Sequence, residues 1–143
     1  MGNLKAFLKS NKKEKKTTQY AATRSLCDEK GNPLLWTIRA ITTKESEVIR
    51  EECTTDIKVP GKPGMYRQKV DTHKLLAKII CAAVVEPDLN SKELQDSYGV
   101  MCAEDLIVEM LDNPDEFGEL ANFVQQYSGL DETMSEKVAE AKN

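Results

Sequence analysis

An apolar stretch from Leu75 to Val85 constrains the fold of this chain more than any other feature. Lys78 is its only charged residue, it holds no Gly or Pro, and the turn residues Glu86-Pro87-Asp88 follow it. As a helix these residues rise only about 16 Å, roughly half of the hydrocarbon thickness of a bilayer. A helix that is apolar on nearly all sides must be buried. The stretch therefore predicts a central core helix at residues 72–85 and not a membrane span, and the other elements are expected to pack around it.

Residues 1–16 are predicted to be an arm and a lysine-rich linker that precede the folded domain. Leu4, Phe7 and Leu8 have the i, i+3, i+4 spacing of a short helical stripe, which is too short to be stable alone. Five lysines follow between residues 9 and 16 with no aromatic residue among them, which favours a solvated linker over a nucleic-acid contact. The same segment lacks the apolar core of a signal peptide. The sequence leaves open whether the arm docks on its own body, on another copy or on a client protein.

A β-hairpin is predicted at the start of the domain, from residues 17–27 and 34–41 around a turn at residues 28–33. In the second run alternate residues share one face, where Trp36 is expected to anchor the core. The residues of that face are Leu34, Trp36, Ile38 and Ala40. Two strands are marginally stable by themselves, so this ribbon must lie on helices or pair with another copy.

Helix signals follow the hairpin. Thr42 and Glu45 have the spacing of a capping box, which predicts a helix at residues 43–53. Its buried side is expected to hold Val48, Ile49 and Cys53. Residues 56–67 contain two Pro and two Gly and are predicted to form a loop.

Three further helices are predicted, at residues 91–97 with Asn90 as N-cap, at 103–112, and from Asn113-Pro114 onward. Their apolar stripes are expected to face the core: Leu94 and Tyr98; Leu106, Ile107, Met110 and Leu111; Phe117, Leu120, Ala121, Val124 and Tyr127 or Ser128. A single globular domain thus spans residues 17–130, and residues 131–143 are read as a polar tail or a frayed helix. The fold class is α+β, mainly α, with the hairpin packed on a bundle of about five helices around the central helix.

Charge is divided unevenly along the chain. Residues 1–92 hold 18 of the 20 Lys and Arg and 11 of the 24 Asp and Glu, a balance of +7, whereas residues 93–143 hold the other 2 and 13, a balance of −11. Such an acidic half repels phosphate, so no nucleic-acid partner is expected. It is either a solvated surface that aids solubility or a docking face for a basic partner, whose affinity would fall at high salt.

No catalytic, metal or cofactor site is predicted. Asp105 and Glu109 have i, i+4 spacing and are the best candidates to share a metal. However, a di-iron bundle would need Glu-x-x-His motifs, and the only histidine, His73, lies outside this acidic half. The four cysteines form no C-x-x-C pair, which favours reduced thiols over a zinc site. Calcium-loop, phosphate-loop, dinucleotide and hydrolase motifs are also missing from the sequence. The residues alone indicate a small protein that is not an enzyme.

Three groups of short motifs carry a family resemblance. The first is Arg24, Gly31, Pro33 and Trp36-Thr37-Ile38-Arg39-Ala40-Ile41-Thr42. The second is Leu75-Leu76-Ala77, Val84-Val85-Glu86-Pro87-Asp88-Leu89, Glu93-Leu94-Gln95 and Tyr98-Gly99-Val100. The third is Met110-Leu111 and Pro114-Asp115-Glu116-Phe117 with Leu120. Over residues 4–130 the chain resembles the XkdN-like tail assembly chaperones of tailed bacteriophages and phage-derived tail particles. Asp115 and Phe117 stand where the family's Pro-Gly-Glu-Tyr element has Gly and Tyr.

The resemblance implies a factor that acts in the cytoplasm of the bacterial host and is not expected in the mature virion. Such proteins bind the phage tape measure protein, a long helical and aggregation-prone chain, and keep it soluble while the tail tube assembles. A structural component retained in the tail is the alternative, and self-association is left open. Our candidate client contacts come from the residues and not from the family motifs: Leu4, Phe7 and Leu8 of the arm, and Phe117, Leu120, Val124 and Tyr127. If charged substitutions at Leu120 and Val124 unfold the protein, these two are core residues instead.

Overall fold

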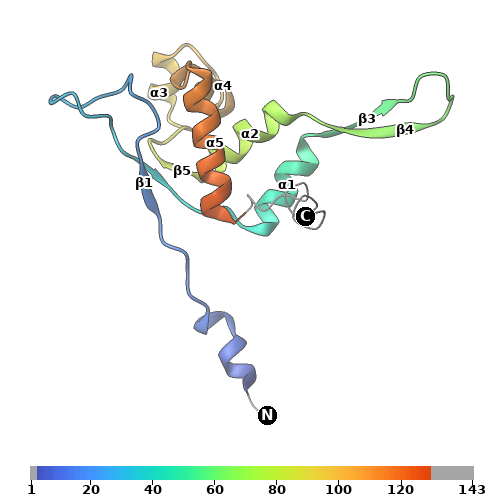
Figure 1. Cartoon of the computed structure of the whole chain (residues 1–143), viewed down its shortest axis with the longest axis horizontal. Coiled ribbons are helices and arrows are strands. Elements are labelled where there is room, and N and C mark those ends of the chain that lie inside the picture. Colours follow the sequence, from blue (N-terminus) through green and yellow to red (C-terminus); the bar gives the residue numbers. More distant parts are fainter. Residues whose placement is uncertain (1–2, 130–143) are drawn as a thin grey trace, which may run out of the picture.

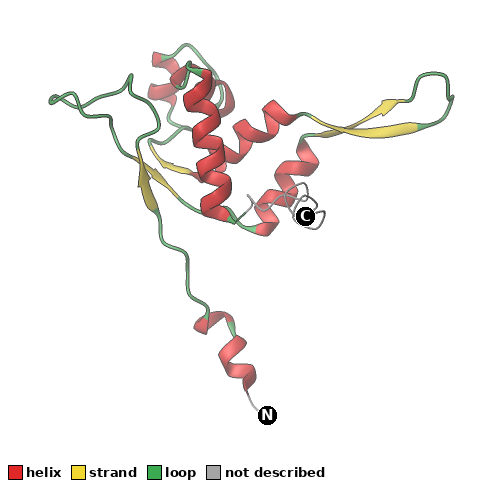
Figure 2. Ribbon diagram, in the orientation of Figure 1, coloured by secondary structure: helices red, strands yellow, loops and turns green. Residues whose placement is uncertain are grey.

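The computed structural model describes residues 3–129, and within them the fold is α+β with five α-helices and five strands in two small sheets (Figures 1 and 2). The α+β class is therefore confirmed. Two short 3₁₀ turns, η1 (Asn3–Phe7) and η2 (Lys9–Asn11), precede the folded body. The predicted tail at residues 131–143 lies outside the described residues.

The central apolar stretch forms helix α2 (Thr72–Ala83), which packs against α1, α4 and α5. Asp71 caps it by accepting a hydrogen bond from the Lys74 amide at 3.2 Å. Its buried residues are Ala77, Ile79, Ile80 and Ala83, whereas its first turn is exposed. The prediction of a core helix is right, but its end at residue 85 is wrong. The β-branched Val84 and Val85 leave the helix and open strand β5 (Val84–Glu86).

Strand β5 joins β1 (Thr18–Tyr20) and β2 (Trp36–Ile38) in an antiparallel sheet of order β1-β2-β5. Tyr20 lies opposite Trp36, and Ile38 lies opposite Val84. Trp36 and Ile38 are buried, as expected for the core face. The strands are much shorter than the predicted runs, and Leu34 is exposed. Between the strands the pairing continues only at an isolated antiparallel bridge, where Cys27 lies opposite Pro33.

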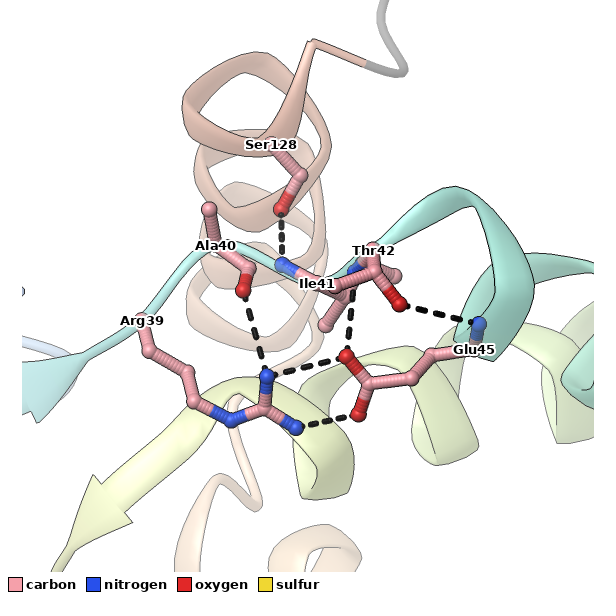
Figure 3. A network of polar contacts seen from close by, with 6 residues as sticks. All are labelled: Arg39, Ala40, Ile41, Thr42, Glu45 and Ser128. Atoms are coloured by element: carbon pink, nitrogen blue, oxygen red, sulfur yellow. Dashed lines mark hydrogen bonds and ion pairs between the residues drawn. The ribbon is translucent and has the colours of Figure 1, made fainter. Parts of the chain in front are cut away.

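The predicted capping box starts helix α1 (Thr43–Glu52). The Thr42 hydroxyl accepts from the Glu45 amide at 3.2 Å, and the Glu45 carboxylate accepts from the Thr42 amide at 3.0 Å (Figure 3). The same carboxylate pairs with Arg39, just past β2, through two hydrogen bonds. On the other side, the Ile41 amide donates to the Ser128 hydroxyl at 2.9 Å. Residues 39–42, which join β2 to α1, are therefore held by Glu45 on one side and by Ser128 on the other.

A second hairpin corrects the predicted loop at residues 56–67. Strands β3 (Thr54–Lys58) and β4 (Tyr66–Val70) pair antiparallel, from Thr54 opposite Val70 to Lys58 opposite Tyr66. Only the tip is irregular, where Gly61 and Gly64 take positive φ. The Pro and Gly residues that suggested a loop occupy this tip, between two strands that the prediction missed. The hairpin projects away from the body (Figure 1).

The last three helices are α3 (Lys92–Ser97), α4 (Ala103–Met110) and α5 (Pro114–Ser128). Ser91, and not Asn90, caps α3, because its hydroxyl accepts from the Leu94 amide. Asn113 caps α5 with Pro114 at its first position, as predicted. The α4 stripe is buried as predicted: Leu106, Ile107, Met110 and Leu111.

Candidate partner-binding surfaces

The N-terminal arm presents its apolar side chains to solvent. Leu4 is 74% exposed, Phe7 82% and Leu8 48%. Among the described elements, the turns η1 and η2 make their main contacts with each other, and Figure 1 shows the arm leaving the body at β1. Three exposed large apolar side chains in one short segment are suited to contact a second protein.

The linker behind the arm is attached to the end of α5. The Tyr127 hydroxyl donates to the Lys16 carbonyl, and the Lys15 ammonium donates to the Tyr127 carbonyl. The same ammonium lies 4.7 Å from the centre of the Tyr127 ring, in a cation–π contact. Phe123 stacks on Tyr20 of β1 with 4.3 Å between ring centres. These contacts fix the root of the arm and leave residues 3–11 projecting.

The α5 stripe that was a candidate client surface is divided. Leu120 and Val124 are fully buried, so neither side chain faces a partner in this conformation. Phe117 is half-buried and stacks on the exposed His73 of α2, with 5.4 Å between ring centres. Tyr127 is half-buried by the linker. The client contacts predicted for this stripe are thus far less accessible than those of the arm.

An apolar groove lies between α1 and α2, with a volume of about 340 Å³. Val48 was predicted to be buried, but it is 47% exposed and forms part of this groove. The prediction was wrong because Val48 and Ile49 are neighbours in a helix, about 100° apart, and only Ile49 reaches the core. The lining residues are Lys44, Glu45, Val48, Ile49 and Ala82. Sequence reasoning missed the groove because it took both side chains for core.

A second hollow of about 440 Å³ continues from Ile49 and Ala82 toward α4. Met101, which is 93% exposed, stands at this hollow. At its rim the Lys78 ammonium lies 3.1 Å from the Glu52 carboxylate and 3.3 Å from that of Glu104. The first hollow has an apolar floor, and the second adds charged and polar side chains beside it. This combination suits an amphipathic helix.

Cys81 lines the second hollow but is not reactive. Burial raises the pKa of its thiol to about 12, and the nearby Glu104 acts in the same direction. The thiol therefore stays protonated at neutral pH and behaves as a small apolar group.

The acidic half contains a concavity of about 490 Å³ beside the N-terminus of α5. Its lining is Arg24, Ser25, Asp112, Asn113, Asp115, Glu116 and Glu119. The Glu116 carboxylate accepts from the Arg24 amide and the Thr23 hydroxyl, both at 2.8 Å, and these bonds lower its pKa. Glu116 thus anchors the connection after β1, and the other carboxylates give the concavity its negative charge.

Within residues 3–129, no three side chains among His, Cys, Asp and Glu come together to hold a metal ion. No helix in that range has the length and apolar character to cross a bilayer.

Known proteins are similar to this chain over nearly its whole length. The sequence model of the family of phage XkdN-like tail assembly chaperone proteins matches residues 4–142 of this chain. The phage-like element PBSX protein XkdN of Bacillus subtilis (strain 168) is 23% identical over 141 residues, which cover 99% of this chain and 94% of the relative. YqbN of the same strain is also 23% identical, over 99% of this chain and 93% of its own length. The crystal structure of YqbN has a TM-score of 0.74 at 19% identity, over 90% of this chain and 98% of that one, which shows a shared fold alone.

Proposed function

Because the chain belongs to the XkdN-like family of phage tail assembly chaperones, we propose that it binds the tape measure protein and keeps it soluble during tail tube assembly. It acts in the cytoplasm of the bacterial host and leaves before the virion is complete. It has no catalytic role in this proposal.

The apolar groove between α1 and α2 is the observation that supports this function best. A tape measure protein is a long helical chain, and an apolar helix face needs an apolar groove to shield it from water. The groove offers Val48, Ile49 and Ala82 as its floor, with Lys44 and Glu45 at its edge. An acidic surface on the other half would keep the complex dispersed, since like-charged complexes repel one another.

A co-purification experiment with a tape measure protein as client tests the proposal. The change is Val48→Lys, which places a charge on the groove floor while keeping helix propensity. Recovery of client should fall roughly tenfold or more, because a buried apolar contact is lost and a charge is desolvated. The measurement is the amount of client in the soluble fraction and in the affinity eluate.

The matched control is Val108→Lys on α4, where the valine is 38% exposed and lies outside the groove. This variant should retain the client. Equal client recovery with both variants would contradict the groove as the binding surface. Mass spectrometry of purified particles distinguishes the alternative, since a retained structural component would be found in them in stoichiometric amounts.

A further inference from the structure

We propose that the N-terminal arm of one copy docks into the α1–α2 groove of a second copy. In the described part of the chain, the arm exposes Leu4 and Phe7, and the groove exposes Val48 beside the buried Ile49. The proposed function gives the same groove to the client, so the arm and the client would compete for it. Measurements on this chain alone, without client, test the arm separately.

The apolar row of the arm and the α1–α2 groove are matched in size and chemical character. In a 3₁₀ turn, residues three apart lie in one row, so η1 places Leu4 and Phe7 side by side along one edge. The groove between α1 and α2 is a short apolar hollow of about 340 Å³, with Val48 open to solvent beside the buried Ile49. An aromatic side chain with one aliphatic neighbour suits a hollow of this kind, since apolar anchors in small pockets dominate such contacts.

The charges favour the arm as the occupant. Lys5 and Lys9 flank the apolar row of the arm, and three of the linker lysines follow before residue 16. Helix α1 carries four glutamates, of which Glu45 and Glu52 already pair with Arg39 and Lys78. Glu47 and Glu51 have no ion pair among the described residues and remain to attract the lysines of the arm. Residues 130–143 are a poorer candidate, because their four acidic residues outnumber two lysines and would meet glutamates of the same sign.

The direction of the arm favours a contact between copies. Lys15 and Lys16 are bound at Tyr127, and from that point the arm extends away from the body (Figure 1). Each copy then donates one arm and accepts another, which is a head-to-tail contact. Such contacts make rings when the rotation closes and open chains when it does not.

The experiment uses full-length protein and sedimentation velocity over a range of concentrations. The arm variant is Leu4→Ser with Phe7→Ser, the groove variant is Val48→Lys, and Val108→Lys is the control. Wild type and control should show a mass that rises with concentration. Each of the other two variants alone should stay at the 16.0 kDa of one chain, with association weakened roughly tenfold or more.

Mixing the two variants gives the decisive result. The arm variant keeps an intact groove and the groove variant keeps an intact arm, so the mixture should form a 1:1 heterodimer and go no further. All substituted side chains are exposed, and circular dichroism melting will verify that each variant is folded. A wild type that stays monomeric at every concentration would overturn the proposal, as would variants that associate like wild type or a mixture that remains monomeric.

Discussion

At the scale of single residues, the Arg39–Glu45 pair shows how one side chain joins two elements. Glu45 completes the capping box of α1 and also holds the guanidinium that follows β2 (Figure 3). The Arg39 hydrogen bonds lower the pKa of Glu45 to about 2 from 4.5, and the same bonds raise the pKa of Arg39. Both partners thus favour their charged forms.

The substitution Glu45→Gln should lower the free energy of unfolding at pH 7 by about 1 kcal/mol, since a pair about a third exposed is screened by water. Glutamine still accepts from the Thr42 amide, so the change isolates the charge. A lowered carboxylate pKa stabilises the fold above pH 4.5, and this contribution is lost as the pH falls toward 2. Urea titrations of both proteins between pH 7 and pH 2 should therefore converge.

Glu47→Gln provides the control, because Glu47 is exposed on the same helix and has no ion pair within the described residues. Its free energy of unfolding should stay within about 0.5 kcal/mol of wild type. A difference between wild type and Glu45→Gln that stays constant down to pH 2 would show that the carboxylate charge is not responsible.

At the scale of elements, the question for α5 is whether its apolar stripe belongs to the core or binds the client. Leu120 and Val124 are fully buried beside α2, so Leu120→Ala should cost about 2–5 kcal/mol in the free energy of unfolding. Asn122→Ala, on the exposed side of the same helix, should change it by less than about 0.5 kcal/mol. Urea denaturation measures both. If Leu120→Ala lost client but kept full stability, α5 would be a client surface after all.

The elements that the sequence predicted are those whose signals are local. The capping box at Thr42, the Asn113-Pro114 start of α5 and the apolar stretch of α2 each specify their own conformation through neighbouring residues. Strand β5 depends on pairing with β2, which is distant in the chain, so Val84 and Val85 read equally well as the end of a helix. The groove depends on how α1 is rotated against α2, and no residue pattern within α1 alone fixes that rotation.

At the scale of the whole molecule, residues 3–129 form a folded body with two projections (Figure 1). The body is built around α2. The buried residues of the body come from segments that precede α2 in the sequence and from segments that follow it. The arm and the β3–β4 hairpin extend away from it (Figure 2). Most strand residues of the hairpin are exposed, and it carries Met65 and Tyr66 on its surface. The buried core therefore lies in the body, whereas both projections expose large apolar side chains.

Hydrogen exchange should resolve these parts, because amides exchange slowly only where opening requires the body to unfold. We expect the amides of α2 and α5 to exchange last, those of β3 and β4 earlier, and those of residues 3–11 first in dilute solution. The hairpin has a full ladder but no core beneath it, and two strands alone are marginally stable. Mass spectrometry after timed labelling measures each segment.

At high protein concentration the arm and the first turns of α1 should become protected together while the hairpin stays unchanged, since only arm and groove are joined between copies. Protection of the hairpin as strong as that of α2 would mean that it is stabilised by contacts absent from this arrangement.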